Sequence, residues 1–139
     1  MANILLVEDQ PTLRQLIDEL LEYSGYQVTS VAGGREALEL LQSGTYFPNL
    51  ILSDLLMDSG NGDELLEAIR SEWLWCGIPF ILMSGKDQID ALRMELKYGV
   101  QGYLEKPFGI ADFLALVQKV ISAPRSNCDQ QALAALRLA

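Results

Sequence analysis

The hydrophobic positions of the chain follow two patterns, which alternate as far as residue 121. Short continuous apolar runs are typical of strands buried on both faces, and apolar residues three or four positions apart are typical of amphipathic helices. The runs predict five strands, at residues 4–7, 27–31, 50–53, 79–83 and 102–104. The helical spacing predicts five helices, whose apolar residues span 13–21, 37–41, 65–69, 89–98 and 110–121.

Residues that start and stop helices separate these elements. Pro11 suits the first turn of the first helix, and Gly25 follows its last turn. The third helix begins at Gly62 or Asp63, and Pro124 stops the last one. Strands and helices therefore alternate five times, which predicts an α/β fold with a five-stranded parallel sheet and helices on both of its faces.

Composition and charge exclude several classes of protein. The chain has 139 residues, 50% hydrophobic and 21% charged, which indicates one globular domain. Because its net charge is −9 and its basic residues are scattered, we expect it to bind neither nucleic acid nor an anionic membrane directly. It has no apolar run long enough to span a bilayer and no signal-peptide pattern. We expect a cytoplasmic protein in which Cys76 and Cys128 are reduced thiols.

Polar residues of particular kinds follow four of the five predicted strands: Glu8 and Asp9, Asp54, Ser84, and Lys106. Parallel strands place these residues on one edge of the sheet, where ligands bind in open α/β folds. Three crowded carboxylates repel one another unless a positive charge lies among them. The sequence contains no histidine, so oxygen atoms must hold any metal ion, which favours Mg²⁺ or Mn²⁺.

In this arrangement we interpret Asp54 as a nucleophile that accepts a phosphoryl group. Lys106 would neutralise a phosphoryl oxygen, and Ser84 would offer a hydroxyl donor. Each residue alone also has an ordinary explanation, as a helix cap, a dipole partner or a turn residue. Their joint placement at the ends of four different strands favours the phosphoryl site.

The sequence strongly resembles the receiver domains of two-component response regulators over residues 3–122. The resemblance rests on separated positions: Glu8 and Asp9, Asp54 in the segment DLLMDSGNG with Met57 and Gly62, Ser84 before Gly85, Tyr103, and Lys106-Pro107-Phe108. It implies a flavodoxin-like sheet of strand order 2-1-3-4-5, with a receiver domain at residues 1–123. It leaves residues 124–139 as a tail, for which a docking helix, a dimer contact and a linker stub all stay open.

The resemblance also implies roles for individual residues at the metal site. Glu8 and Asp9 correspond to the acidic pair that binds Mg²⁺. Asp54 corresponds to the phosphoacceptor and a further ligand, and the backbone carbonyl of Leu56 completes the set of protein ligands.

The remaining roles concern the switch. Ser84 and Tyr103 correspond to the switch pair, and Lys106 to the lysine that binds the phosphoryl group. The family further implies a cis peptide bond between Lys106 and Pro107.

The implied function is that of a signalling domain rather than an enzyme with its own substrate. A histidine kinase or a histidine phosphotransfer protein would donate the phosphoryl group, and the domain would promote only its own phosphorylation and dephosphorylation. Phosphorylation would then shift the population of states at the face made by the fourth helix, fifth strand and fifth helix. A target protein or a second copy would bind that face, since we expect no output domain after Pro124.

Two departures from the family pattern concern the rates at which the phosphoryl group is gained and hydrolysed. Asp58 stands where the family usually has proline, and we expect its charge to raise metal dependence or slow phosphorylation. Leu56 and Lys86 occupy positions that tune hydrolysis in this family. Because a bulky apolar Leu56 should hinder an attacking water, we expect a long-lived phosphoaspartate.

Two other classes of function compete with this interpretation. A Mg²⁺-dependent phosphohydrolase with an aspartyl-phosphate intermediate usually carries a second acid two residues after the nucleophile, where this chain has Leu56. An interaction module of the same fold that needs no phosphorylation commonly lacks the acceptor or the acidic pair, and this chain has both.

Overall fold

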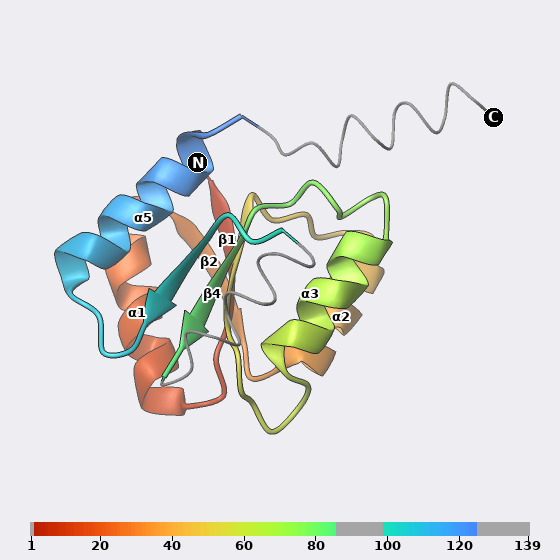
Figure 1. The fold of residues 1–139 in the computed structure, drawn as a ribbon, viewed down its shortest axis with the longest axis horizontal. Coiled ribbons are helices and arrows are strands. Elements are labelled where there is room, and N and C mark those ends of the chain that lie inside the picture. Colours follow the sequence, from red (N-terminus) through yellow and green to blue (C-terminus); the bar gives the residue numbers. More distant parts are fainter. Residues whose placement is uncertain (1, 86–98, 125–139) are drawn as a thin grey trace.

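One parallel sheet lies at the centre of the computed structural model, which describes residues 2–85 and 99–124 (Figure 1). Its strands are β1 (Asn3–Val7), β2 (Gln27–Val31), β3 (Leu50–Asp54), β4 (Phe80–Ser84) and β5 (Gly102–Glu105). The helices described are α1 (Pro11–Tyr23), α2 (Gly34–Gln42), α3 (Gly62–Ser71) and α5 (Ile110–Ser122). The predicted fourth helix, at 89–98, and the tail after residue 124 lie outside the described residues.

The strand order β2-β1-β3-β4-β5 confirms the predicted flavodoxin-like topology. All four pairs of neighbouring strands are parallel. In their register Val7 pairs with Ser53, and Asp54 pairs with Met83. Because the strands run the same way and end at similar heights, the residues that follow β1, β3, β4 and β5 meet at one edge.

Two hydrophobic layers hold the helices to the sheet. Successive side chains of a strand point to opposite faces, so Leu5 belongs to the layer under α2 and α3 while Leu6 belongs to the layer under α1 and α5. Figure 1 shows these two pairs of helices on opposite sides of the strands. The sheet is therefore covered on both faces, as the continuous apolar runs predict.

Residues at the starts of α1 and α3 fix where these two helices begin after the strands β1 and β3. Pro11 occupies the first turn of α1, as predicted. Asn61 begins α3 with a capping box, in which its backbone N–H donates to the Glu64 carboxylate (3.4 Å). This cap places the first residue of α3 at Gly62, which decides between the two predicted starts.

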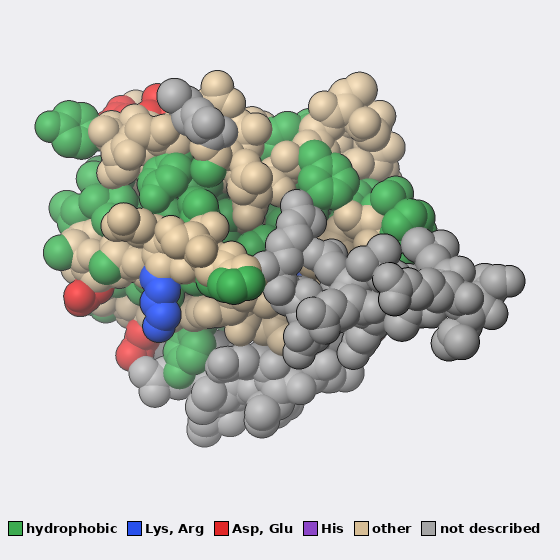
Figure 2. All heavy atoms as spheres, turned by 90° about the horizontal axis from the view of Figure 1, so that it is seen from above, with side chains coloured by type: hydrophobic (Ala, Val, Ile, Leu, Met, Phe, Trp, Pro, Cys, Tyr) green, Lys and Arg blue, Asp and Glu red, His purple; other side chains and the backbone are tan. Residues whose placement is uncertain are grey.

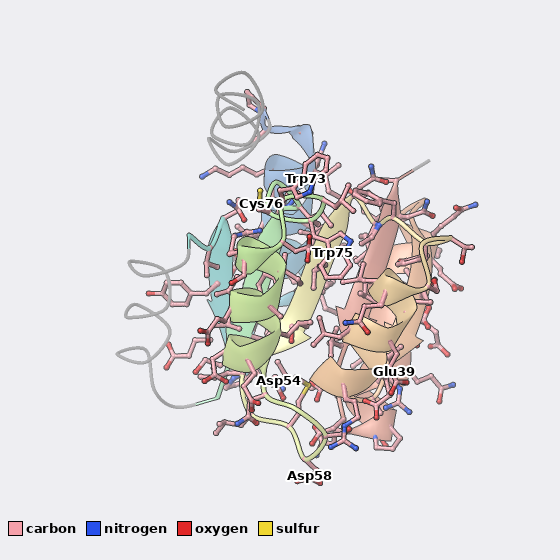
Figure 3. The ribbon with its side chains drawn as sticks, turned by 90° about the vertical axis from the view of Figure 1, so that its right-hand side faces the viewer. Glu39, Asp54, Asp58, Trp73, Trp75 and Cys76 are labelled. Atoms are coloured by element: carbon pink, nitrogen blue, oxygen red, sulfur yellow. The ribbon has the colours of Figure 1, made fainter. Side chains whose placement is uncertain are left out.

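The opposite end of the sheet, at the amino ends of the strands, carries apolar surface and no predicted site residue. Figure 2 views this end and shows hydrophobic side chains across much of the part not drawn in grey. Figure 3 shows Trp73 and Cys76 at this end, far from Asp54. The prediction of reduced thiols is wrong for Cys76, which is disulfide-bonded; Cys128 lies outside the described residues.

Arg70 ties the elements at this end together. Its guanidinium donates to the carbonyl oxygens of Gly99 (3.1 Å), Cys76 (3.0 Å) and Ile78 (2.8 Å) and to Gln101 Oε1 (2.9 Å). Burial lowers the pKa of Arg70 to about 10, so the side chain stays charged at neutral pH. Among the helices described, none is long and apolar enough to cross a membrane.

Candidate functional site

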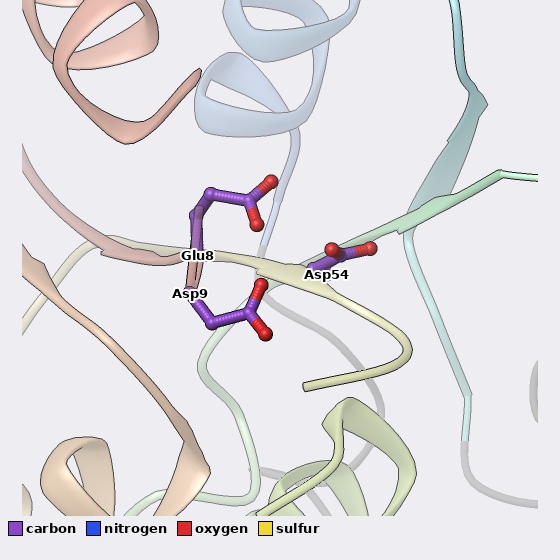
Figure 4. Close-up of side chains that lie close together, drawn as sticks. All are labelled: Glu8, Asp9 and Asp54. Carbon is purple, nitrogen blue, oxygen red and sulfur yellow. The ribbon is translucent and has the colours of Figure 1, made fainter. Parts of the chain in front are cut away.

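Three carboxylates meet at the carboxyl end of the sheet, as the sequence predicts. Glu8 and Asp9 directly follow β1, and Asp54 is the last residue of the neighbouring strand β3. One oxygen atom of each carboxylate lies within 4.8 Å of the others (Figure 4). Glu8 is fully buried, Asp54 nearly so, and Asp9 is partly exposed.

Lys106 brings a positive charge into this group from the residue after β5. Its Nζ donates to Glu8 Oε1 (2.8 Å) and to Asp54 Oδ2 (3.0 Å). The lysine thus bridges two strands that are distant in sequence. Of the predicted site residues, Glu8, Asp9, Asp54 and Lys106 are brought into one cluster.

The pKa shifts agree with a crowded, partly desolvated cluster. Burial raises the pKa of Glu8, the hydrogen bond from Lys106 opposes that rise, and the nearby Asp54 charge adds to it. For Lys106 burial acts to lower the pKa, but the bonds to Glu8 and Asp54 outweigh it and raise the pKa. The lysine is therefore firmly protonated between the two acids.

The donor set of this cluster fits a divalent, oxygen-loving cation. Three carboxylates and one ammonium group carry a formal charge of −2 when all are ionised. The cluster contains no sulfur or imidazole ligand, because the chain has no histidine and both strand ends supply only carboxylates. Such a site suits Mg²⁺ or Mn²⁺, which take one or two carboxylates together with water and phosphate oxygens.

The surroundings of Asp54 hold its carboxylate in one orientation. Its Oδ1 accepts a hydrogen bond from the Leu55 N–H (2.9 Å), while Oδ2 receives Lys106. Gly62 packs so closely on the Asp54 backbone that a side chain there would collide with the Asp54 carbonyl. The glycine that marks the family pattern therefore lets the start of α3 approach the acceptor strand.

Ser84 and Tyr103 lie on the two strands beyond Asp54. Ser84 is buried at the end of β4, one residue past the Met83 that pairs with Asp54. Its carbonyl accepts the Lys106 N–H (2.7 Å), and the Lys106–Pro107 bond is cis, as predicted. Tyr103 is partly buried against the apolar layer under α2 and α3.

One contact of this edge was missed by the sequence reasoning. The backbone N–H of Asp58, in the loop between β3 and α3, donates to Asp9 Oδ2 (3.3 Å). In the same loop the residue Leu56 is 73% exposed. The sequence indicates a role for Asp58 only through the charge of its side chain. A backbone N–H donor has no sequence signature, so the hydrogen bond from Asp58 to Asp9 is seen only in the structure.

The chain is similar to known proteins over most of its length. The family model of the response regulator receiver domain matches residues 4–118. The chain is 37% identical over 121 residues to the sensor histidine kinase TmoS of Ectopseudomonas mendocina, and 34% identical over 128 residues to the response regulator ArlR of Staphylococcus saprophyticus. These matches cover 86% and 91% of this chain but only 12% and 56% of those two proteins.

A solved structure supports the same assignment. The chemotaxis response regulator CheY4 of Vibrio cholerae is similar with a TM-score of 0.76 and 29% identity, over 86% of this chain and 98% of that one. The match therefore extends over nearly the whole of a known receiver fold. The chain belongs to the response regulator receiver domains, the phosphoacceptor domains of two-component signalling.

Proposed function

We propose that Asp54 is the residue that accepts the phosphoryl group, from a histidine kinase or a histidine phosphotransfer protein. The observation that carries the proposal is the Lys106 ammonium, which lies 3.0 Å from Asp54 Oδ2 and 2.8 Å from Glu8 Oε1. A carboxylate oxygen of Asp54 attacks the phosphorus, the bond to the donor breaks, and the donor leaves with its electron pair. Lys106 and the Ser84 hydroxyl then stabilise the phosphoryl oxygens.

The proposed metal ligands are the carboxylates of Glu8, Asp9 and Asp54 and the backbone carbonyl of Leu56. A bound Mg²⁺ or Mn²⁺ supplies positive charge to the phosphoryl oxygens. The role of this chain's own residues is to hold that charge beside Asp54 and, through the Lys106 hydrogen bond, to favour the ionised form of Glu8 against the effect of burial. The formal charge of −2 and the all-oxygen donors support this assignment.

The proposed switch couples Asp54 to the partner face. Ser84 follows the strand position paired with Asp54, and Tyr103 lies on β5, the strand next to Ser84. A bond from Ser84 to the phosphoryl group would favour one state, and Tyr103 would change its packing with it. The face proposed to respond comprises residues 89–98, β5 and α5, and its partner is a downstream protein or a second copy.

The boundaries and location of the domain remain part of this proposal. We assign the receiver domain to residues 1–123 and the tail to 124–139, and we place the domain in the cytoplasm, as is general for receivers. The chain spans 12% and 56% of the length of the two curated relatives named above, TmoS and ArlR. The activities of those whole proteins are therefore not assigned to this chain.

The experiment that tests the function is incubation with a small phosphodonor and Mg²⁺, followed by intact mass spectrometry. We expect one phosphoryl group per chain, released by hydroxylamine because an aspartyl phosphate is an acyl phosphate. Repeated turnover of a phosphate ester would instead indicate a phosphohydrolase. If no adduct forms with any phosphodonor, the chain is an interaction module and the proposal is wrong.

Replacing Asp58 by asparagine should speed phosphorylation by a small anionic donor about two- to threefold. The exposed carboxylate repels the donor, and exposed charge interactions are worth about 0.2–1 kcal/mol. The measurement is the initial rate at saturating Mg²⁺, at low and at high salt. Since exposed charges are screened, the advantage should shrink at high salt, and a salt-independent effect would argue against repulsion.

Proline at position 58 is a different change from asparagine, because it also removes the N–H that donates to Asp9 (3.3 Å). We therefore expect Asp58→Pro to gain less than Asp58→Asn. If both variants match the natural protein in metal affinity and rate, Asp58 does not set the timing.

Replacing Leu56 by asparagine should shorten the life of the phosphoaspartate about tenfold, which is about 1.4 kcal/mol in the hydrolysis barrier. The reason is that Leu56 offers an apolar side chain two residues from Asp54, whereas an amide can orient a water molecule. The measurement is the decay of the purified adduct. Leu74→Asn, at an exposed leucine on the loop after α3, is the matched control and should leave the decay unchanged.

A further inference from the structure

Helix α2 begins against the loop between β3 and α3, and the two segments satisfy each other's backbone groups. The first N–H groups of a helix have no partner within it. At α2 the N-cap residue is Gly33, which has no side chain to cap them; instead Gly34 N–H donates to the Gly60 carbonyl (3.0 Å) and Arg35 N–H to the Ser59 carbonyl (3.1 Å). The loop is thus the N-terminal cap of α2, and α2 in turn fixes the middle of the loop.

Three glycines make this close approach possible. A side chain at Gly33 would lie 2.8 Å from Ser59 Cβ and from Glu36 Oε2, and one at Gly34 would lie 2.9 Å from the Gly60 carbonyl oxygen. Gly60 has φ +88°, a conformation that side chains rarely adopt. The contact is therefore specified by the sequence at three positions.

A side-chain hydrogen bond locks the same contact. The Ser59 hydroxyl donates to Glu36 Oε1 at 2.7 Å, across 23 residues of sequence. That bond is the largest cause of the lowered pKa of Glu36, so the accepting carboxylate is ionised at neutral pH. Hydrogen bonds to charged acceptors are stronger than those between neutral groups.

The locked loop leads directly into the phosphoacceptor site. Asp58, next to Ser59, donates its N–H to Asp9 Oδ2 (3.3 Å), and Met57 donates its N–H to Asn61 Oδ1 (3.0 Å). Between Met57 and Asp54 lies Leu56, whose carbonyl is a proposed metal ligand. In Figure 3 the loop that carries Asp58 runs from the Asp54 strand toward one end of α2.

We propose that Ser59 and Glu36 are positioning residues, whose hydrogen bond holds the loop at 55–61 in the geometry that binds the divalent cation. This inference rests on the proposed function, because it assigns Leu56 and Asp9 to the metal site. When the bond is absent the loop samples more positions, and binding must select the competent one. Saturating metal restores that position, so the defect lies in affinity rather than in the maximal rate.

The test is calorimetric titration of Mg²⁺ into the unphosphorylated protein, together with phosphorylation rates as a function of Mg²⁺. In Ser59→Ala we expect the Mg²⁺ dissociation constant to rise about fivefold, which corresponds to about 1 kcal/mol. The phosphorylation rate of this variant at saturating Mg²⁺ should stay within about twofold of the rate of the natural protein, because the activation barrier itself changes little. Ser59→Thr keeps the hydroxyl and should restore the affinity.

Ser43→Ala is the matched control. It removes a hydroxyl that donates to the Leu40 carbonyl (2.6 Å) at the other end of the same helix. If Ser59→Ala binds Mg²⁺ as tightly as the natural protein, or if Ser43→Ala weakens binding equally, the inference is overturned. Failure of the proposed function is a separate result, since the natural protein would then take up no phosphoryl group even at saturating Mg²⁺.

Discussion

Replacing Asp54 by asparagine should abolish the phosphoryl adduct. The amide lacks the nucleophilic carboxylate oxygen, and no neighbouring acid has the same position relative to Lys106: Glu8 accepts a hydrogen bond from the lysine but lies fully buried directly after β1. Asparagine keeps the size of the side chain and the oxygen that accepts the Leu55 N–H, so the fold should persist. The measurement is intact mass after incubation with a phosphodonor and Mg²⁺.

The same variant should bind Mg²⁺ about tenfold more weakly, a change of about 1.4 kcal/mol. It removes one of the three carboxylates whose oxygens lie within 4.8 Å of one another, and the charge count of the ligands sets the affinity of such sites. Glu67→Gln, at an exposed carboxylate on α3, is the control for loss of one negative charge. An adduct of unchanged yield in Asp54→Asn would show that another residue is the acceptor.

The fold could be predicted because its signals are local. Continuous apolar runs mark strands covered on both faces, and the polar residue after each run marks the edge where the strands end. The strand boundaries differ by about one residue from those predicted: β3 includes Asp54, because Leu55 N–H still bonds to Met83 on β4. The apolar run of side chains therefore ends before the backbone pairing does.

What escaped prediction depends on contacts between distant segments. Glu36 reads as an ordinary acidic residue in the first turn of a helix, which favours the helix dipole. Its bond to Ser59 exists only because the sheet brings α2 beside the β3–α3 loop. The backbone donor of Asp58 escaped for the same reason, and the pairing state of Cys76 was predicted wrongly from sequence context alone.

Replacing Lys106 by methionine should slow phosphorylation about a hundredfold, the usual effect of losing one electrostatic donor at a transition state. It should also destabilise the metal-free protein by about 2–3 kcal/mol. Removing one partner of a buried ion pair costs about 3–5 kcal/mol, and partial exposure reduces that figure here. The side chains of Lys106, Glu8 and Asp54 are 22%, 1% and 13% exposed.

The pH dependence of that destabilisation gives a second measurement, by thermal unfolding in the presence of a chelator. The pKa of Glu8 is already raised by burial in the natural protein, and without the Lys106 bond it should rise further. A raised carboxyl pKa means that stability is greatest when the group is protonated and is lost as pH rises through the folded pKa. The cost of Lys106→Met should therefore be largest near neutral pH and shrink in acid.

Added Mg²⁺ should stabilise Lys106→Met more than the natural protein, because the variant lacks the cation that offsets Glu8 and Asp54. Lys106→Arg keeps the positive charge and should recover part of the stability. The planar guanidinium group of arginine cannot reproduce both contacts of the lysine Nζ, to Glu8 and to Asp54. Lys119→Met, an exposed lysine on α5, should leave stability and phosphorylation unchanged. Equal effects at Lys119 and Lys106 would mean that net charge, rather than the bridge between Glu8 and Asp54, governs both properties.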